Sequence, residues 1–166
     1  PTAPLIAETG GLNAMIVDST ALPEQAVRDI LASSFQSAGQ RCSALRCLYL
    51  QEDVAGTVTE MLFGAMDELT LGDPWALSTD VGPAIDAQAH AGIAAHVEAA
   101  RSEGRLMKSL TAPEGGHFLA PAVISVPGIE AMQREIFGPV LHVATFRAGE
   151  VDKIVARLNA TGYGLT

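Results

Sequence analysis

The sequence predicts an α/β fold in three layers, with helices covering both faces of a mainly parallel sheet. Short apolar segments alternate along the chain with longer segments whose apolar residues recur at helical spacing. Strands that alternate with helices are typical of parallel sheets buried on both faces. The 166 residues, 48% hydrophobic and 17% charged, are enough for one domain with a sizeable core.

The first half of the chain supplies two strands and two helices. Residues 13–18 form a short apolar run between Gly-Gly and Asp-Ser-Thr, which is typical of a strand. Residues 21–39 carry apolar side chains at helical spacing, with a proline in the first turn and a glycine at the end. Residues 45–51 are a second buried strand, and residues 52–69 place their apolar side chains on one face of a second helix.

The second half begins with an interruption of this pattern. Residues 70–83 are rich in Gly, Pro and Asp and have the length of a functional loop. Residues 84–104 are rich in alanine and end in glycine, which favours a third helix. Three short strands and a last helix complete the chain: residues 105–109, 122–126 and 140–146, followed by residues 149–162.

Charge and hydropathy exclude several classes of partner. The formal charge is −9 and the basic residues are scattered, so the surface repels phosphate backbones and nucleic acid is not expected as a partner. No apolar run approaches the ~20 residues of a membrane span, and no leader-like segment opens the chain. We therefore expect a cytoplasmic location. Because the sequence opens with Pro1 and ends in a strand-like segment, we expect it to be part of a longer polypeptide.

The two cysteines lie five residues apart in "SAGQRCSALRCLYLQ". The loop between them is too short and too ordered for a structural disulfide, which favours a reducing compartment. Cys47 lies inside an apolar strand, where a free cysteine acts as a small buried hydrophobic residue. Cys42 follows Gly-Gln-Arg at a turn between helix and strand. A thiol beside Arg41 in such a turn has the position of a nucleophile.

The histidines do not suggest a metal site. His90 and His96 are six residues apart on one expected helix, about 240° around its axis, and so cannot bind one metal together. His142 lies in an apolar strand and His117 beside a Gly-Gly turn, and we expect both to be structural. No zinc-binding spacing is present in the sequence, so no metal is predicted.

Two carboxylates lie next to glycine turns. Glu8 precedes Gly10 and Gly11, where the backbone is able to pass close to a ligand and the carboxylate to face a cavity. The alternative is a solvated loop carboxylate. Glu135 precedes the Gly138–Pro139 turn, and taken alone it is expected at the surface.

Five short motifs, "ETGGLN", "GQRC", "TDVGP", "EIFGPV" and "LNATGYGL", follow one another with compatible gaps. Together they resemble the aldehyde dehydrogenase superfamily over almost the entire chain. The cysteine segment quoted above, "GDPWALSTDVGPAID" and Thr-Gly-Gly-Leu-Asn after Glu8 are most similar to its pyrroline-5-carboxylate (L-glutamate γ-semialdehyde) dehydrogenase branch, especially the C-terminal module of bifunctional proline utilization A proteins. Many other aldehyde dehydrogenases have lysine where Leu12 stands.

The resemblance implies an aldehyde dehydrogenase catalytic-domain fold and a set of chemical roles. Cys42 attacks the aldehyde carbon to form a thiohemiacetal, and its backbone N–H helps to hold the oxyanion. After hydride transfer to NAD, Glu8 deprotonates the water that hydrolyses the thioester. Ser43 helps to bind the substrate carboxylate.

The resemblance also implies a cofactor site. Glu135 binds the ribose hydroxyls of the nicotinamide half of NAD, Phe137 packs near the nicotinamide, and Gly10 lies beside the cofactor. The substrate is a small aldehyde, L-glutamate γ-semialdehyde, oxidised to L-glutamate in proline catabolism.

Residues 1–166 correspond to part of the catalytic domain. The family's NAD-binding domain lies upstream and its aldehyde-anchor loop downstream, so we expect the isolated chain to bind NAD weakly and to have little activity. We expect the longer protein to be a homo-oligomer, and membrane association through a proline dehydrogenase module stays open. Three alternatives also stay open: an aldehyde dehydrogenase for another substrate class, a cysteine hydrolase or thioesterase using Cys42 with a histidine, and a non-catalytic assembly module.

Overall fold

A computed structural model describes residues 3–6 and 10–166. In chain order the elements are β1 (Asn13–Val17), α1 (Pro23–Phe35), the 3-10 helix η1 (Gln36–Gly39), β2 (Leu45–Gln51), α2 (Glu52–Asp67), α3 (Ala87–Ser102), β3 (Leu106–Ser109), β4 (Ala122–Ser125), the 3-10 helix η2 (Ile129–Ala131), β5 (Val140–Phe146) and α4 (Val151–Ala160). None of the helices in these ranges is long and apolar enough to span a membrane.

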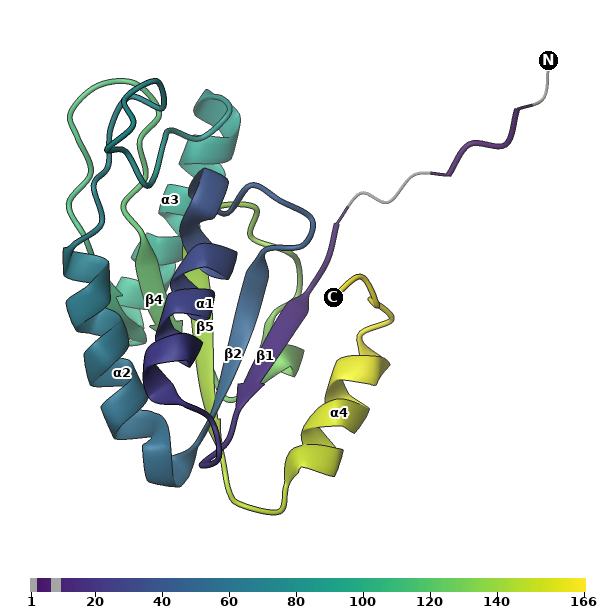
Figure 1. Cartoon of the computed structure of the whole chain (residues 1–166). Coiled ribbons are helices and arrows are strands. Elements are labelled where there is room, and N and C mark those ends of the chain that lie inside the picture. The colour runs from purple at the N-terminus through teal and green to yellow at the C-terminus, as the bar shows by residue number, and fades with distance from the viewer. Residues whose placement is uncertain (1–2, 7–9) are drawn as a thin grey trace.

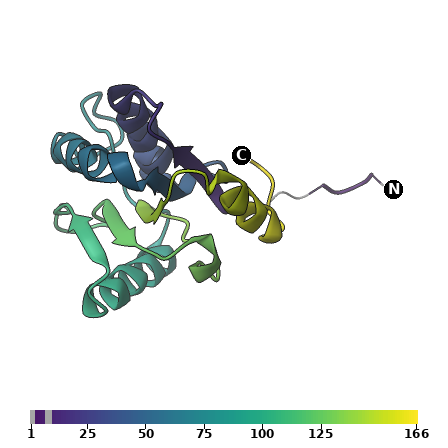
Figure 2. The same ribbon diagram turned by 90° about the horizontal axis from the view of Figure 1, so that it is seen from below.

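The strands form one sheet in the order β1-β2-β5-β4-β3. The pairs β1–β2, β2–β5 and β4–β5 are parallel, whereas β3 runs antiparallel to β4 at one edge. Helices cover both faces of the sheet (Figure 1), and in the view from below α1 and α2 lie on one side of it and α3 on the other (Figure 2). The three-layer, mainly parallel fold predicted from the sequence is therefore confirmed.

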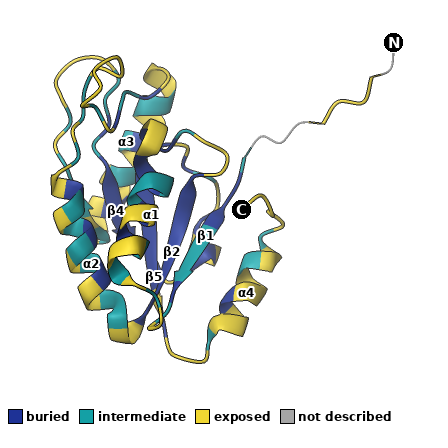
Figure 3. Cartoon of the chain, viewed as in Figure 1, coloured by how far each residue is buried: buried dark blue, intermediate teal, exposed yellow. Residues whose placement is uncertain are grey.

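Strand β2 shows how the two faces of the sheet are filled. All seven of its residues are buried, as expected for a central parallel strand (Figure 3). Because side chains alternate across a strand, Cys47 and Tyr49 join the apolar cluster beneath α3 and α4, while Leu48 and Leu50 join the cluster beneath α1 and α2. The core thus lies in two layers, one on each side of the sheet.

The largest difference from the expected boundaries is at the first helix, which was predicted over residues 21–39 and ends at Phe35. The next residues turn the chain, because Ser37 and Ala38 have φ angles of 55° and 53° and Gly39 follows at 65°. Left-handed backbone breaks the helix, although buried Ala38 continues its apolar pattern. A Cβ on Gly39 would lie 2.2 Å from the Gly138 carbonyl oxygen, so only glycine allows these two segments to approach this closely.

The expected loop over residues 70–83 is present and is closed at its base. Leu71 pairs with Val81 in an isolated β-bridge, and the Thr70 N–H donates to the Asp80 carboxylate at 2.8 Å. The next helix, α3, begins after Asp86, whose side chain accepts the Ala89 N–H at 2.7 Å. This cap explains why the helix starts three residues later than its apolar pattern predicts.

Candidate active site

Cys42 lies in the turn between η1 and β2, and its side chain is exposed. The backbone around Cys42 is held by hydrogen bonds from the Asn13 side chain. Buried Asn13 donates its side-chain amide to the Cys42 carbonyl at 2.7 Å and to the Ala44 carbonyl at 2.8 Å. Arg41, whose charge was expected beside the thiol, donates through Nε to Ser37 Oγ at 3.1 Å. The turn therefore presents an accessible thiol on a fixed backbone.

Cys47 has the opposite surroundings. Its side chain is fully buried within β2, and burial raises the pKa of its thiol to about 12. A thiol with this pKa stays protonated and is a poor nucleophile at neutral pH. The sequence predicted an accessible Cys42 and a Cys47 in the core, and the structure confirms both positions.

The glycines before β1 lie against Glu135, although they are distant from it in sequence. The Gly11 N–H donates to Glu135 Oε2 at 3.1 Å. A Cβ on Gly10 would lie 2.7 Å from the same oxygen, and a Cβ on Gly11 would lie 2.7 Å from the Cys42 carbonyl oxygen. The sequence predicted that the backbone passes close to a ligand here; in the structure the group that it approaches is the Glu135 carboxylate. Glu8 lies outside the described residues.

The local sequence predicted that Glu135 lies at the surface, and this prediction is wrong. Only 12% of its side chain is exposed, and it forms an ion pair with Arg46 at 2.9 Å. The local sequence did not show this because the partner lies 89 residues away, at the start of β2.

Arg46 did not stand out in the sequence. Its side chain has no exposed surface, and burial lowers the pKa of its guanidinium while the Glu135 carboxylate opposes that change. Nε and Nη2 donate to Glu135 Oε1, Nη1 donates to the Gly138 carbonyl, and Nη2 also donates to the Arg41 carbonyl at 3.1 Å. A basic residue within an apolar strand is the one signal that would have revealed it, since a buried charge requires partners.

A cavity of about 340 Å³ opens beside this network, between the start of α3 and residues 134–137. Glu135 and Phe137 both line it, and 42% of Phe137 is exposed. The Arg46 guanidinium carbon lies 5.4 Å from the centroid of the Phe137 ring. Ser43, next to the thiol, lines a different hollow with Arg41 and residues of α1. The structure thus brings Gly10, Glu135 and Phe137 together and places Ser43 apart.

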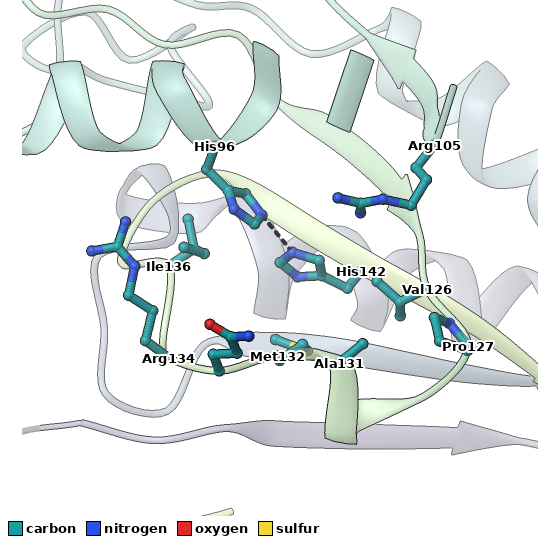
Figure 4. Close-up of a pocket in the computed structure, with 10 residues that line it drawn as sticks. His96, Arg105, Val126, Pro127, Ala131, Met132, Arg134, Ile136 and His142 are labelled. Atoms are coloured by element: carbon teal, nitrogen blue, oxygen red, sulfur yellow. Dashed lines mark hydrogen bonds between the residues drawn. The ribbon is translucent and has the colours of Figure 1, made fainter. Parts of the chain in front are cut away.

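A second cavity, about 480 Å³, lies further along α3 and is lined by two histidines (Figure 4). Nε2 of His96 lies 2.9 Å from Nε2 of His142, and Nδ1 of His142 lies 3.1 Å from the Arg46 carbonyl oxygen. Because a carbonyl only accepts, His142 carries its proton on Nδ1 and accepts a hydrogen bond from His96. Burial, followed by the neighbouring His96, lowers the pKa of His142 to about 4.

These histidines form a partly buried pair, and the structure does not connect them with the thiol. In the part of the chain that the structure describes, no hydrogen bond joins a histidine to Cys42. A cysteine hydrolase requires such a pair, so this alternative gains no support. Within the same ranges no group of three or more His, Cys, Asp or Glu side chains is arranged to hold a metal ion.

Comparison with known proteins agrees with the motif order. The family model described as "Aldehyde dehydrogenase family" matches residues 1–166. The chain is 53% identical over 171 aligned residues to the bifunctional protein PutA of Klebsiella aerogenes, and 40% identical over 168 to the 1-pyrroline-5-carboxylate dehydrogenase of Geobacillus kaustophilus. Each alignment covers 98% of this chain, but the chain spans only 13% and 32% of the lengths of these relatives.

Solved structures give the same result. A crystal structure of bifunctional proline utilization A superposes with a TM-score of 0.94 at 48% identity, covering 99% of this chain and 17% of that one. Betaine aldehyde dehydrogenase from Staphylococcus aureus, solved in complex with NAD+, gives a TM-score of 0.80 at 27% identity, covering 91% of this chain and 31% of that one.

Proposed function

Because the chain belongs to the aldehyde dehydrogenase family, we propose that the protein containing it oxidises L-glutamate γ-semialdehyde to L-glutamate with NAD, in proline catabolism. One observation supports this function above all others. The exposed Cys42 thiol lies on a turn that Arg46 joins to the cavity-lining carboxylate of Glu135. The choice of aldehyde is supported by the identities to PutA and 1-pyrroline-5-carboxylate dehydrogenase.

The chain represents a partial catalytic domain of a longer enzyme, called the intact enzyme below. The relatives are about three to eight times as long as the region they share with it, since the chain spans 13% to 32% of their lengths. The remainder of the NAD site and the aldehyde-anchor loop then lie elsewhere in the intact enzyme. On its own the chain binds NAD weakly and has little activity. The intact enzyme is a cytoplasmic homo-oligomer, and the PutA relatives suggest a proline dehydrogenase module within it.

The residues present fit a nicotinamide ribose. Glu135 Oε1 accepts from both Nε and Nη2 of Arg46, whereas Oε2 accepts only from Gly11 and so keeps a lone pair for a ribose hydroxyl. The same carboxylate and the exposed ring of Phe137 line one cavity, and Gly10 leaves the space beside Oε2 open. When bound, NAD supplies the hydride acceptor.

Cys42 carries the covalent chemistry. Its sulfur bonds to the aldehyde carbon, the carbonyl π bond breaks, and the backbone N–H of Cys42 stabilises the oxyanion. Loss of hydride from that carbon leaves a thioester on Cys42. Water, deprotonated by Glu8, then attacks the thioester; the C–S bond breaks, the carboxylic acid leaves and the thiolate is regenerated. Ser43 binds the substrate carboxylate.

The test compares the two cysteines in the intact enzyme. Cys42→Ala is expected to abolish NADH formation from the semialdehyde and to remove the site that iodoacetamide labels, whereas Cys47→Ala retains both because Cys47 is buried. The two variants are matched, since each replaces one thiol by a methyl group. Labelling confined to Cys47, or unchanged NADH formation by Cys42→Ala, contradicts the proposal.

A further inference from the structure

We propose that Arg46 is a positioning residue that sets the direction of the Cys42 backbone N–H and the orientation of the Glu135 carboxylate together. The inference rests on the proposed function, in which Cys42 attacks the aldehyde and Glu135 binds the cofactor. Because the Arg46 side chain has no exposed surface, it cannot touch substrate or cofactor and acts only through the groups that it holds.

The first of these groups is the peptide bond between Arg41 and Cys42. Arg46 Nη2 donates to the Arg41 carbonyl at 3.1 Å. A trans peptide is planar, so this carbonyl and the Cys42 N–H point in opposite directions in one rigid unit. Holding the oxygen therefore fixes the direction of the N–H that stabilises the oxyanion. Asn13 holds the next carbonyl, that of Cys42, at 2.7 Å.

The second group is the Glu135 carboxylate. Arg46 donates to Oε1 through Nε at 3.1 Å and Nη2 at 2.9 Å, while Gly11 donates to Oε2 at 3.1 Å. With both oxygens held, the carboxylate cannot rotate freely. The guanidinium also lies beside Phe137, the other residue expected at the cofactor.

Arginine is required for this double role. Its planar guanidinium offers donors in several fixed directions, and here Arg46 serves three acceptor groups: one carboxylate oxygen and two backbone carbonyls. A lysine ammonium carries the same charge, but it cannot direct donors along the same plane. The Glu135 charge also offsets part of the cost of burying the guanidinium, which explains how a charged side chain is accommodated at the start of an apolar strand.

A double-mutant cycle in the intact enzyme tests the inference. Arg46→Met is expected to raise the KM for NAD by about tenfold and to lower kcat by about tenfold, since hydrogen bonds to charged groups contribute about that factor or more. In the Glu135→Gln background, Arg46→Met should not raise the KM for NAD further, because its effect on the cofactor passes through Glu135. It should still lower kcat, because the Arg41 carbonyl is held independently.

Two further variants control for folding and charge. Arg46→Lys keeps the charge and completes the same cycle if Arg46→Met does not fold, and it is expected to resemble the methionine variant. Arg28→Met, at an exposed arginine of α1, should change neither constant. Equal KM effects of Arg46→Met in both backgrounds, an unchanged kcat, or full rescue by lysine overturns the inference. If the unsubstituted enzyme transfers no hydride to NAD, the proposed function itself fails, so the two failures are distinguishable.

Discussion

Acidification should destabilise this fold through His142. The ring is 2% exposed, and it is held neutral between the Arg46 carbonyl and His96. Protonation at Nε2 would replace the hydrogen bond from His96 with a contact between two donors, within a site that already disfavours charge. The folded protein therefore resists taking a proton that the unfolded chain accepts readily.

The magnitude follows from the two pKa values of this histidine. The pKa is 6.5 as the ordinary value and about 4 in the folded protein. Well above pH 6.5 neither state binds the proton and the free energy of unfolding is unaffected. As the pH falls below 6.5 the unfolded state binds more protons, so stability decreases, by about 2 kcal/mol at pH 5 and about 3 kcal/mol near pH 4 at about 1.4 kcal/mol per pH unit.

Urea unfolding between pH 7 and pH 5 measures this loss. His142→Asn keeps a donor for the Arg46 carbonyl but cannot be protonated, so it should be less stable at pH 7 and lose about 2 kcal/mol less than the unsubstituted protein on acidification. His117→Asn, in a partly exposed loop, should retain the full pH dependence. If the unsubstituted protein and His142→Asn lose the same free energy, His142 is not buried in the neutral form described above.

Three glycine substitutions give further expectations. Gly10→Ala places a Cβ 2.7 Å from Glu135 Oε2 and should raise the KM for NAD of the intact enzyme by about tenfold, with little change in thermal stability. Gly39→Ala combines a φ of 65° with a Cβ 2.2 Å from the Gly138 carbonyl oxygen and should lower the free energy of unfolding by more than about 2 kcal/mol in urea. Gly64→Ala, in α2 where nothing lies within 4 Å of the new Cβ, should raise it by about 0.5–1 kcal/mol. A stable Gly39→Ala, or an unchanged cofactor KM for Gly10→Ala, contradicts the contacts described.

Most of the fold could be predicted from the sequence because the spacing of apolar residues differs clearly between its strands and its helices. The strand expected over residues 45–51 is found at those residues, and helix 52–69 ends two residues early. The break after Phe35 could not be predicted from the apolar pattern. Ala38 is buried at the spacing expected of a helix, although its backbone is left-handed.

The contacts of the site were less predictable than the identities of its residues. Cys42 stood out by its position in a turn, but the partners of Glu135 depend on tertiary structure. Arg46 and Gly11 lie 89 and 124 residues away from Glu135. The meeting of His96 with His142 depends in the same way on how α3 packs on the sheet.

The position of the site explains why general fold rules also could not locate it. In open α/β sheets, ligands usually bind outside the carboxyl ends of the strands. Here Gly10 and Gly11 precede β1, Cys42 precedes β2, and Glu135 precedes β5. Because these three strands are neighbours and run parallel, their amino ends meet at one edge of the sheet. Arg46, near the start of the middle strand, reaches the segments that enter both β2 and β5. The order of the strands, more than any single motif, therefore brings the turn that carries Cys42 and the Glu135 carboxylate to one side chain.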